Sequence, residues 1–303
     1  MENLVLDSVY YDKWYRLANL KDSSKERMKI PLKELGNFIR EFGYSGAELN
    51  FDKFYYSEED DGYEPLDLDF VESYVEFLKD NKTEQSLRSH FSAVKSFFNF
   101  LESMEMIEEN PFGRYPTSFH KQTLKNRALS PDESDSLLQA AALLDPFFLQ
   151  YAVLILTCLT CGLRSRELCN LKLSQVNFDI GTIVINKGQK TFAGSVHMLP
   201  SLLKYMKAYV EHPYFLEWLG QERDKELFFM DSKPLTNQKL NGLIKKIAEK
   251  ANIKRNVTSH DLRATMCYLM YLEGYPIHII QRQMRHKKEW TTLSYLPIKN
   301  RLT

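Results

Sequence analysis

Residues 146–168 read PFFLQYAVLILTCLTCGLRSREL and contain the longest apolar run of the chain. Gln150 interrupts this run, which is too short to span a bilayer. An apolar stretch that stops at a glycine predicts a buried helix ending near Gly162, because glycine readily adopts the backbone angles that close a helix. The charged motif that follows therefore starts where a core helix ends, and we expect a second short helix at about 166–171.

Patterns on both sides of this helix predict the rest of its domain. Upstream, SPDE at 130–133 predicts a helix start, with a serine cap, a proline at the first position and acids in the first turn. Three strand-like runs follow downstream: QVNFD (175–179), GTIVIN (181–186) and TFAGSVHMLP (191–200). They predict a small antiparallel sheet with a tight hairpin at 187–190. Helices are expected from Pro200 onward, with one further strand pattern at 227–229.

The first half of the chain carries helical patterns. Apolar residues recur at spacings of three and four in the segments 24–42, 67–80 and 83–106. In the last segment they form one continuous stripe, which predicts a buried face. The opposite side of that segment carries Arg88, His90 and Lys95, which either face DNA or form a solvated surface.

An acidic stretch, SEEDDGYEPLDLD, occupies residues 57–69 between two of these helices. The glycine and proline within it predict an exposed loop. A DNA duplex would repel its charge, so we expect this stretch to point away from DNA or to meet a basic protein surface.

The length of 303 residues favours two domains, because it exceeds the usual size of a single hydrophobic core. The stretch NPFGRYPTSFHKQTLKNR (110–127) has two prolines, a glycine and no sustained periodicity, which is typical of a linker. We therefore predict a mainly α fold with a small antiparallel β-sheet (α+β). A helical domain spans 1–112, a linker 113–127 and a second domain 128–303.

The zero net charge conceals two halves of opposite sign. Residues 1–120 hold 14 lysines and arginines against 24 aspartates and glutamates, whereas residues 121–303 hold 26 against 16. The basic second half suits a partner made of phosphates, because cationic side chains displace the counterions of DNA. The N-terminus lacks a basic start followed by an apolar run, so we expect a cytoplasmic protein without membrane association.

Four cysteines include one C-x-x-C pair, Cys158 and Cys161. The pair lies inside the apolar run, and no second pair or nearby histidines complete a tetrahedral zinc site. We therefore expect buried thiols and no metal.

Four charged motifs stand out in the second domain: CGLRSREL (161–168), INKGQK (185–190), SHDLRATM (259–266) and MRHKKEWTTLSY (284–295). Any one of them is weak evidence, but their order and spacing are specific. In this order they resemble the tyrosine recombinases, a family of phage and transposon integrases and bacterial Xer-like chromosome-dimer resolvases. The resemblance covers the second domain and, more loosely, the first. It implies a helical SAM-like core-binding domain followed by a catalytic tyrosine recombinase domain.

The resemblance implies a role for each motif residue. Tyr295 would attack a backbone phosphate and leave a 3′-phosphotyrosine and a free 5′-hydroxyl. Arg164 and Arg263 would grip the scissile phosphate, which suits arginine because its planar fork binds two oxygens at once. His260 would transfer a proton or contact the phosphate, and His286 would contact the phosphate. No nucleotide is expected, since the phosphotyrosine bond stores the energy for resealing. No metal is expected, since fixed cations and hydrogen-bond donors would gather the charge around phosphorus.

The departing 5′-oxygen needs a proton donor. Lys187 aligns with the hairpin lysine of the family, and Lys190 is the alternative. Glu167 is expected to orient neighbouring groups.

Some residues depart from the family pattern. Arg285 precedes His286 where glycine is common, and Arg166 stands where a small residue is usual. Only eight residues follow Tyr295, fewer than many relatives use for a tail that docks on a neighbouring protomer.

The resemblance implies a site-specific recombinase that acts on double-stranded DNA in DNA integration, excision or dimer resolution, in a bacterial or mobile-element context near the nucleoid. The family works as a tetramer on two DNA sites, with accessory DNA-bending proteins or a partner recombinase in some members. Two alternatives remain. One is relaxation of supercoils by the same covalent chemistry, as in type IB topoisomerases, and the other is a DNA-binding module without catalysis.

Overall fold

The structure is a computed structural model that describes residues 3–44, 46, 48–57, 61–116, 127–186, 193–222 and 224–296. The chain divides into two compact units, Met1–Thr123 and Leu124–Thr303. The division falls inside the linker predicted at 113–127. No helix in the described part of the chain combines the length and apolar character needed to cross a membrane.

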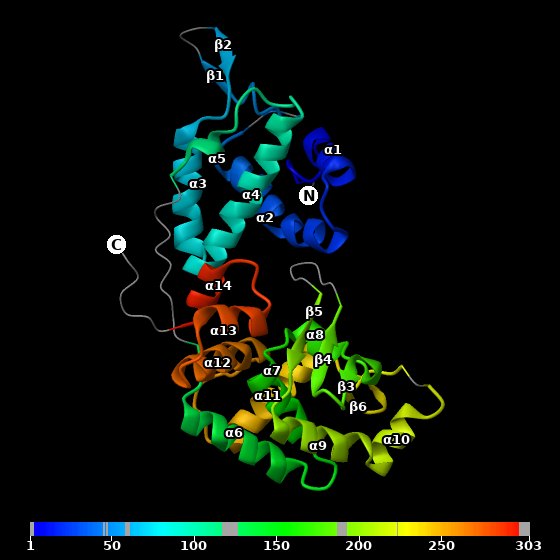
Figure 1. Cartoon of the computed structure of the whole chain (residues 1–303). Coiled ribbons are helices and arrows are strands. Elements are labelled where there is room, and N and C mark those ends of the chain that lie inside the picture. The colour runs from blue at the N-terminus through cyan, green and yellow to red at the C-terminus, as the bar shows by residue number, and fades with distance from the viewer. Residues whose placement is uncertain are drawn as a thin grey trace. The chain divides into compact units, whose positions relative to one another are not determined.

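The first unit is helical with one short hairpin (Figure 1, blue to green). Its elements are α1 (Val9–Leu17), α2 (Asp22–Glu41), β1 (Tyr55–Ser57), β2 (Gly62–Glu64), α3 (Leu68–Asn81), α4 (Glu84–Ser103) and α5 (Pro111–Arg114). The three predicted helices are α2, α3 and α4. Asp67 and Thr83 lie just outside α3 and α4 because their side chains cap these helices, each accepting a hydrogen bond from a backbone N–H of the first turn.

The apolar stripe predicted for the third helix lines α4 and is buried, with exposed fractions of at most 4% from Leu87 to Leu101. Trp14 of α1 is fully buried and meets Phe97 of α4 edge to face, with ring centroids 5.8 Å apart. Aromatic packing of this kind gives the first unit its own hydrophobic core.

Two expectations for the first unit need correction. The acidic stretch 57–69 is not one loop, because Gly62–Glu64 pairs with Tyr55–Ser57 as an antiparallel hairpin. Strands of three residues are too short to show an alternating pattern in the sequence. His90 does not lie on an exposed face, since it is only 9% exposed and its Nε2 lies 2.8 Å from Glu34 Oε2.

The second unit is mainly helical around a small sheet (Figure 1, green to red). Its helices are α6 (Pro131–Leu144), α7 (Gln150–Cys161), α8 (Ser165–Cys169), the 3-10 turn η2 (Leu173–Gln175), α9 (Pro200–Val210), α10 (Pro213–Leu219), α11 (Asn237–Lys250), α12 (Ser259–Leu272), α13 (Ile277–Met284) and α14 (Glu289–Leu293). Its strands are β3 (Val176–Asn177), β4 (Thr182–Ile185), β5 (Gly194–His197), β6 (Phe229–Met230) and β7 (Lys233–Pro234).

The strands form antiparallel sheets. β3, β4 and β5 pair in sequence order, with Ile183 of β4 opposite Val176 on one side and Val196 on the other. β6 and β7 form a separate short hairpin. The mainly α fold with a small antiparallel sheet is therefore as predicted.

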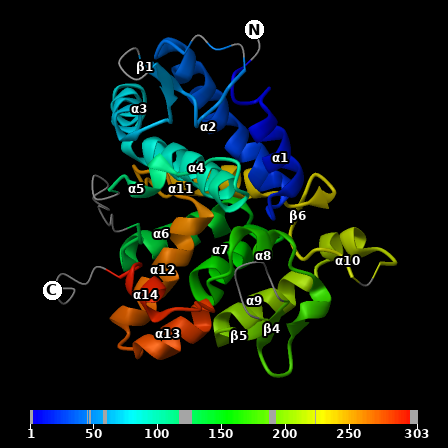
Figure 2. The ribbon, with the colours of Figure 1, turned by 90° about the horizontal axis from the view of Figure 1, so that it is seen from above.

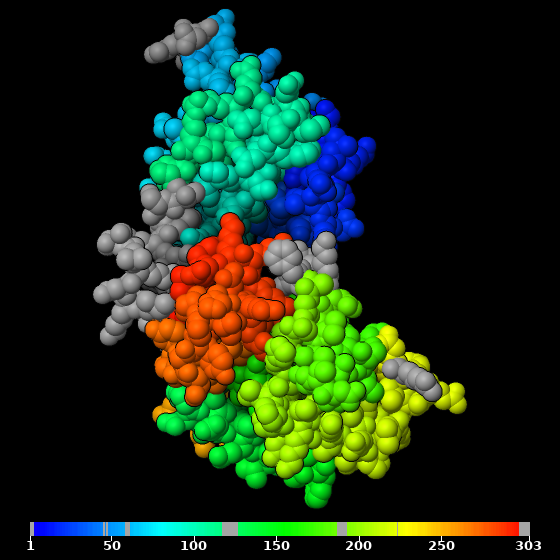
Figure 3. All heavy atoms as spheres, viewed as in Figure 1, coloured from blue at the N-terminus to red at the C-terminus, as the bar shows by residue number. Residues whose placement is uncertain are grey.

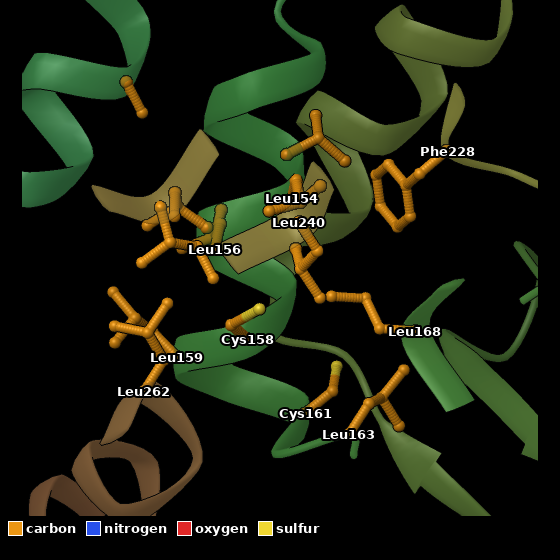
Figure 4. Close-up of a cluster of buried hydrophobic side chains, with 14 of the residues drawn as sticks. Leu154, Leu156, Cys158, Leu159, Cys161, Leu163, Leu168, Phe228, Leu240 and Leu262 are labelled. Atoms are coloured by element: carbon orange, nitrogen blue, oxygen red, sulfur yellow. The ribbon is translucent and has the colours of Figure 1, made fainter. Parts of the chain in front are cut away.

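The long apolar run contains α7, the central helix of the second unit. Figure 4 shows its side chains, among them Leu154, Cys158 and Cys161, surrounded by leucines of neighbouring elements. Burial raises the pKa of Cys161 to about 12 and that of Cys158 further, so neither thiol is a ready thiolate ligand for a metal. These thiols belong to the core.

Helix α12 packs beside α7, and α13 and α14 follow it on the same side of the unit (Figures 1 and 2). In the space-filling view the orange and red segment that contains α13 and α14 forms part of the surface (Figure 3). This packing brings the end of α7, the start of α12 and the chain after α14 together, and four of the six predicted site residues lie at these three places.

Candidate active site

A pocket of about 180 Å³ lies where these three segments meet. Its walls are Arg164, Ser165, Ser259, His260, Arg263 and Tyr295. Four of the six predicted site residues therefore line one pocket, although they lie up to 131 positions apart between Arg164 and Tyr295.

The turn between α7 and α8 presents Arg164. Gly162 has a φ of +57°, and an added Cβ would lie 3.0 Å from the Met284 sulfur and 3.1 Å from that of Met266. Glycine is therefore favoured both by the backbone angle and by the close packing. Arg164 then occupies the N-cap position of α8.

Glu167 holds Arg164 through both its backbone and its side chain. One carboxylate oxygen accepts a hydrogen bond from the Arg164 backbone N–H at 2.8 Å, and the other accepts one from Nη1 at 3.2 Å. The Arg164 side chain remains 32% exposed. Its guanidinium is thus oriented by a carboxylate and still open to the pocket.

The first turn of α12 presents His260 and Arg263. Thr258 caps this helix and Asp261 bonds back to it, so that the helix begins at Ser259 as a capping box. The backbone N–H of Ser259 donates to Asn241 Oδ1 of α11 at 2.9 Å. The spacing of three between His260 and Arg263 puts both side chains on the pocket side.

Arg263 is a buried guanidinium, only 2% exposed. It donates through Nη1 to the carbonyl oxygen of Gly162 and through Nη2 to that of Met284. Burial and the nearby Arg164 lower the pKa of Arg263 to about 10, which leaves it charged at neutral pH. Arg263 therefore joins the turn before Arg164 to the turn before His286.

His286 lies next to Arg263 but is not one of the pocket walls. Its Nε2 is 3.2 Å from Arg263 Nη2, and its Nδ1 is 3.0 Å from Thr292 Oγ1. Arginine can only donate, so Nε2 accepts and the proton sits on Nδ1. Burial, reinforced by Arg263, lowers the pKa of His286 to about 3, which keeps the ring neutral. Both ring nitrogens are thus engaged by the protein.

Tyr295 follows α14 and lies against both histidines. Its hydroxyl oxygen is 3.4 Å from His260 Nε2, and its ring stacks on His286 with centroids 5.4 Å apart. Burial and the neighbouring Arg127 and Arg263 lower the pKa of His260, so its ring is neutral at neutral pH. A neutral His260 is able to accept the proton of a phenol at this distance.

The predicted proton donor lies outside the described residues, as does its alternative. Lys187 and Lys190 belong to residues 187–192, between β4 and β5. Their place in the chain is the connection of an antiparallel pair.

Some residues of the site escaped the sequence analysis. Asn241 orients the start of α12, and no motif marks it. Thr292 contacts His286 and lies within the motif 284–295, but it was not singled out there. Arg285 was noted only as a departure from a glycine. Its φ of +53° explains why glycine suits this position, and its Nη2 donates to Glu167.

Comparison with known proteins agrees with this arrangement. Residues 127–300, more than half of the chain, match the profile of the phage integrase family. The chain belongs to the phage integrase family. The tyrosine recombinase XerA of Pyrococcus horikoshii is 28% identical over 287 residues, covering 90% of this chain and 92% of its own. The tyrosine recombinase XerC of Bacillus pumilus is 25% identical over 270 residues, covering 84% of each.

Solved structures of two integrases have a similar fold. The Tn1549 transposon integrase in complex with transposon right end DNA is 16% identical and has a TM-score of 0.69, covering 97% of this chain and 94% of its own. A lambda integrase dimer bound to a COC′ core site is 14% identical with a TM-score of 0.68, covering 97% and 95%. The match of residues 127–300 confirms the predicted family, and the structural likenesses extend over nearly the whole chain.

Proposed function

We propose that the chain is a site-specific DNA recombinase that cuts and rejoins duplex DNA through a 3′-phosphotyrosine intermediate. The observation that carries the proposal is the pocket in which the Tyr295 hydroxyl, His260 and the guanidinium groups of Arg164 and Arg263 converge. Membership of the phage integrase family supports it, and so does the DNA in the complexes of the Tn1549 and lambda integrases.

The arrangement fits an attack on a phosphodiester. A phosphate in the pocket meets Arg164 and Arg263, whose fixed charges stabilise the negative charge that builds up around phosphorus. The Tyr295 oxygen forms the new bond to phosphorus while His260 Nε2 takes the phenolic proton. His286 supports this step by accepting from Arg263 and by stacking on the tyrosine ring.

The bond from phosphorus to the 5′-oxygen breaks in the same step. We assign the proton that this oxygen needs to Lys187, with Lys190 as the alternative, because a hairpin connection can carry a lysine to the DNA. Rejoining is the reverse reaction, in which a 5′-hydroxyl attacks the phosphotyrosine. The ester retains the bond energy, so we propose that no nucleotide takes part. We also propose that the fixed charges of Arg164 and Arg263 take the place of a metal.

The partner we propose is double-stranded DNA, which the basic half of the chain suits. XerH of the same fold class was solved on its difH substrate before and after cleavage. Exchange between two duplexes requires several protomers, so we propose a tetramer on two DNA sites. We also propose that accessory DNA-bending or partner proteins assist it and that it acts at the nucleoid.

A strand-exchange assay tests the proposal. The Tyr295→Phe protein, which should bind without cutting, first selects a binding site from a random duplex library. Two duplexes of different length that carry this site are then incubated with wild-type protein. We expect recombinant duplexes of new lengths that Tyr295→Phe does not form. Relaxation of supercoiled DNA without any recombinant would favour the topoisomerase alternative, and binding without either would favour a non-catalytic module.

A further inference from the structure

Arg285 connects two parts of the pocket that are far apart in the chain. Its Nη2 donates to Glu167 Oε2, the oxygen that also accepts from the Arg164 backbone N–H at 2.8 Å. The other oxygen of Glu167 accepts from Arg164 Nη1 at 3.2 Å. One carboxylate therefore links Arg285, directly before His286, to the backbone and side chain of Arg164.

Arg285 occupies this place under conditions that do not favour an arginine. Its φ of +53° and ψ of +44° lie in the left-handed region, where a side chain is strained. The side chain is only 4% exposed. Its Nε and Nη1 are buried, and neither has a hydrogen-bond partner in the part of the chain that the structure describes. Glycine would avoid all three penalties, so stability does not account for this residue.

The charge of Glu167 explains why an arginine stands at position 285. A carboxylate that pairs with Arg164 alone would offset the positive charge that a phosphate needs. When the carboxylate is shared with a second guanidinium, the group of three keeps a net positive charge. Arg285 is not one of the residues that line the pocket, so its effect on a phosphate held there must pass through Glu167.

We propose that Arg285 is a positioning residue for DNA cleavage. It shares the Glu167 carboxylate with Arg164, and thereby keeps Arg164 aligned and its charge available to the scissile phosphate. Arg263 makes a parallel connection, because it joins Gly162 and Met284 of the same two turns. The role of Arg285 rests on the proposed recombinase function.

Single-turnover cleavage tests the proposal. Protein in excess is mixed with a duplex that carries the selected site and a nick next to the scissile phosphate, so that the covalent adduct is trapped. The rate constant of adduct formation is measured at saturating protein, and affinity is measured separately. Arg285→Gly should fold, since glycine suits the backbone angle. We expect it to bind DNA with nearly unchanged affinity and to cleave about tenfold more slowly, because Arg164 is misaligned.

Two further variants separate positioning from a merely structural role. Arg285 reaches Glu167 through one nitrogen, so Arg285→Lys keeps a charged donor and should recover most of the rate. In a Glu167→Gln background, Arg285→Gly should have little further effect, because the charge that Arg285 offsets is gone. If the glycine variant does not fold, Arg285→Met, which keeps a long buried stem without charge, replaces it in the same comparison.

The outcomes are distinct for the two proposals. A wild-type protein that forms no adduct on its selected site would overturn the proposed function itself. A wild-type adduct together with wild-type rates for Arg285→Gly would overturn only the role of Arg285. If Arg285→Gly costs the same factor in rate with and without the Glu167→Gln substitution, its action through Glu167 is overturned.

Discussion

The two arginines of the pocket differ in their surroundings. Arg164 is 32% exposed in its side chain and is oriented by Glu167, whereas Arg263 is 2% exposed and bonds to two carbonyl oxygens. Arg263 therefore also contributes to the shape of the site, while Arg164 is the more accessible cation.

Replacing Arg164 by lysine should be severe although the charge is kept. A lysine cannot bind two phosphate oxygens in one plane and reach Glu167 at the same time. We expect Arg164→Lys to slow single-turnover cleavage by about 100-fold. Arg166→Lys is the matched control, since Arg166 is exposed on the same short helix. The rate constant of this variant should lie within about threefold of that of the wild type. Equal rates for the two variants would remove Arg164 from the phosphate site.

The pH dependence of cleavage should report His260. The pKa of His260 is lowered from its ordinary value near 6.5, mainly by burial, so the base form persists below that pH. The cleavage rate should be constant above about pH 6.5 and should fall as acid protonates His260, with a midpoint below 6.5. His260→Gln should cleave slowly and lose this acid limb. A midpoint above 6.5 in the wild type would contradict the assignment.

Sequence reasoning found four of the residues that line the pocket but, apart from Glu167, not the residues that orient them. Arg164, His260, Arg263 and Tyr295 stand in motifs whose order is informative, and the pocket unites them. Glu167 was expected to orient its neighbours, and it does. The contact of Arg285 with Glu167 spans 118 residues, and such a contact leaves no trace in local spacing.

At the scale of elements, the site depends on the turn that ends α7. Gly162 should not tolerate a side chain, because its φ is +57° and two methionine sulfurs lie 3.0 and 3.1 Å from an added Cβ. We expect Gly162→Ala to lower the free energy of unfolding by about 1–3 kcal/mol. Gly242→Ala is the control, since nothing lies within 4 Å of an added Cβ inside α11. That change should raise stability by about 0.5–1 kcal/mol. Chemical denaturation of both variants measures the change in the free energy of unfolding. Changes of the same sign for Gly162→Ala and Gly242→Ala would contradict this account of the turn.

The connection between β4 and β5 carries the proposed proton donor. Removing this donor should matter only when the leaving group needs a proton. We expect Lys187→Ala to slow cleavage of ordinary DNA by at least about 100-fold. A substrate with sulfur in place of the leaving 5′-oxygen should restore the rate, because a thiolate departs without a proton. Lys190→Ala should show neither effect. The opposite pattern would assign the role to Lys190.

Element boundaries followed from local rules where caps were present. The helix start predicted at 130–133 is confirmed, because Ser130 caps α6, Pro131 is its first residue and Glu133 completes a capping box with Ser130. The hairpin of β1 and β2 was missed because composition alone made 57–69 a loop, and pairing between short strands is a non-local contact. The environment of His90 could not be predicted because its partner, Glu34, lies on another helix.

At the scale of the whole molecule, opposite charges are separated along the chain. The acidic surplus of the first 120 residues and the basic surplus of the remainder, 14 against 24 and 26 against 16 cationic and anionic residues, cancel in the total. The basic part contains the pocket. This distribution explains how a chain of zero net charge suits a phosphate-rich partner. Under the proposed function, the second unit is the main source of salt-dependent attraction to DNA.

The central claim is that Tyr295 becomes covalently attached to DNA. The most direct measurement is mass spectrometry of the proteolysed adduct trapped on a nicked duplex that carries the selected site. We predict one modified peptide, with the 3′-phosphate of the cut strand attached to Tyr295. Tyr295→Phe should give no adduct, whereas Tyr271→Phe, which alters an exposed tyrosine of α12, should give the normal amount. An adduct on another residue, or one that persists in Tyr295→Phe, would contradict the account.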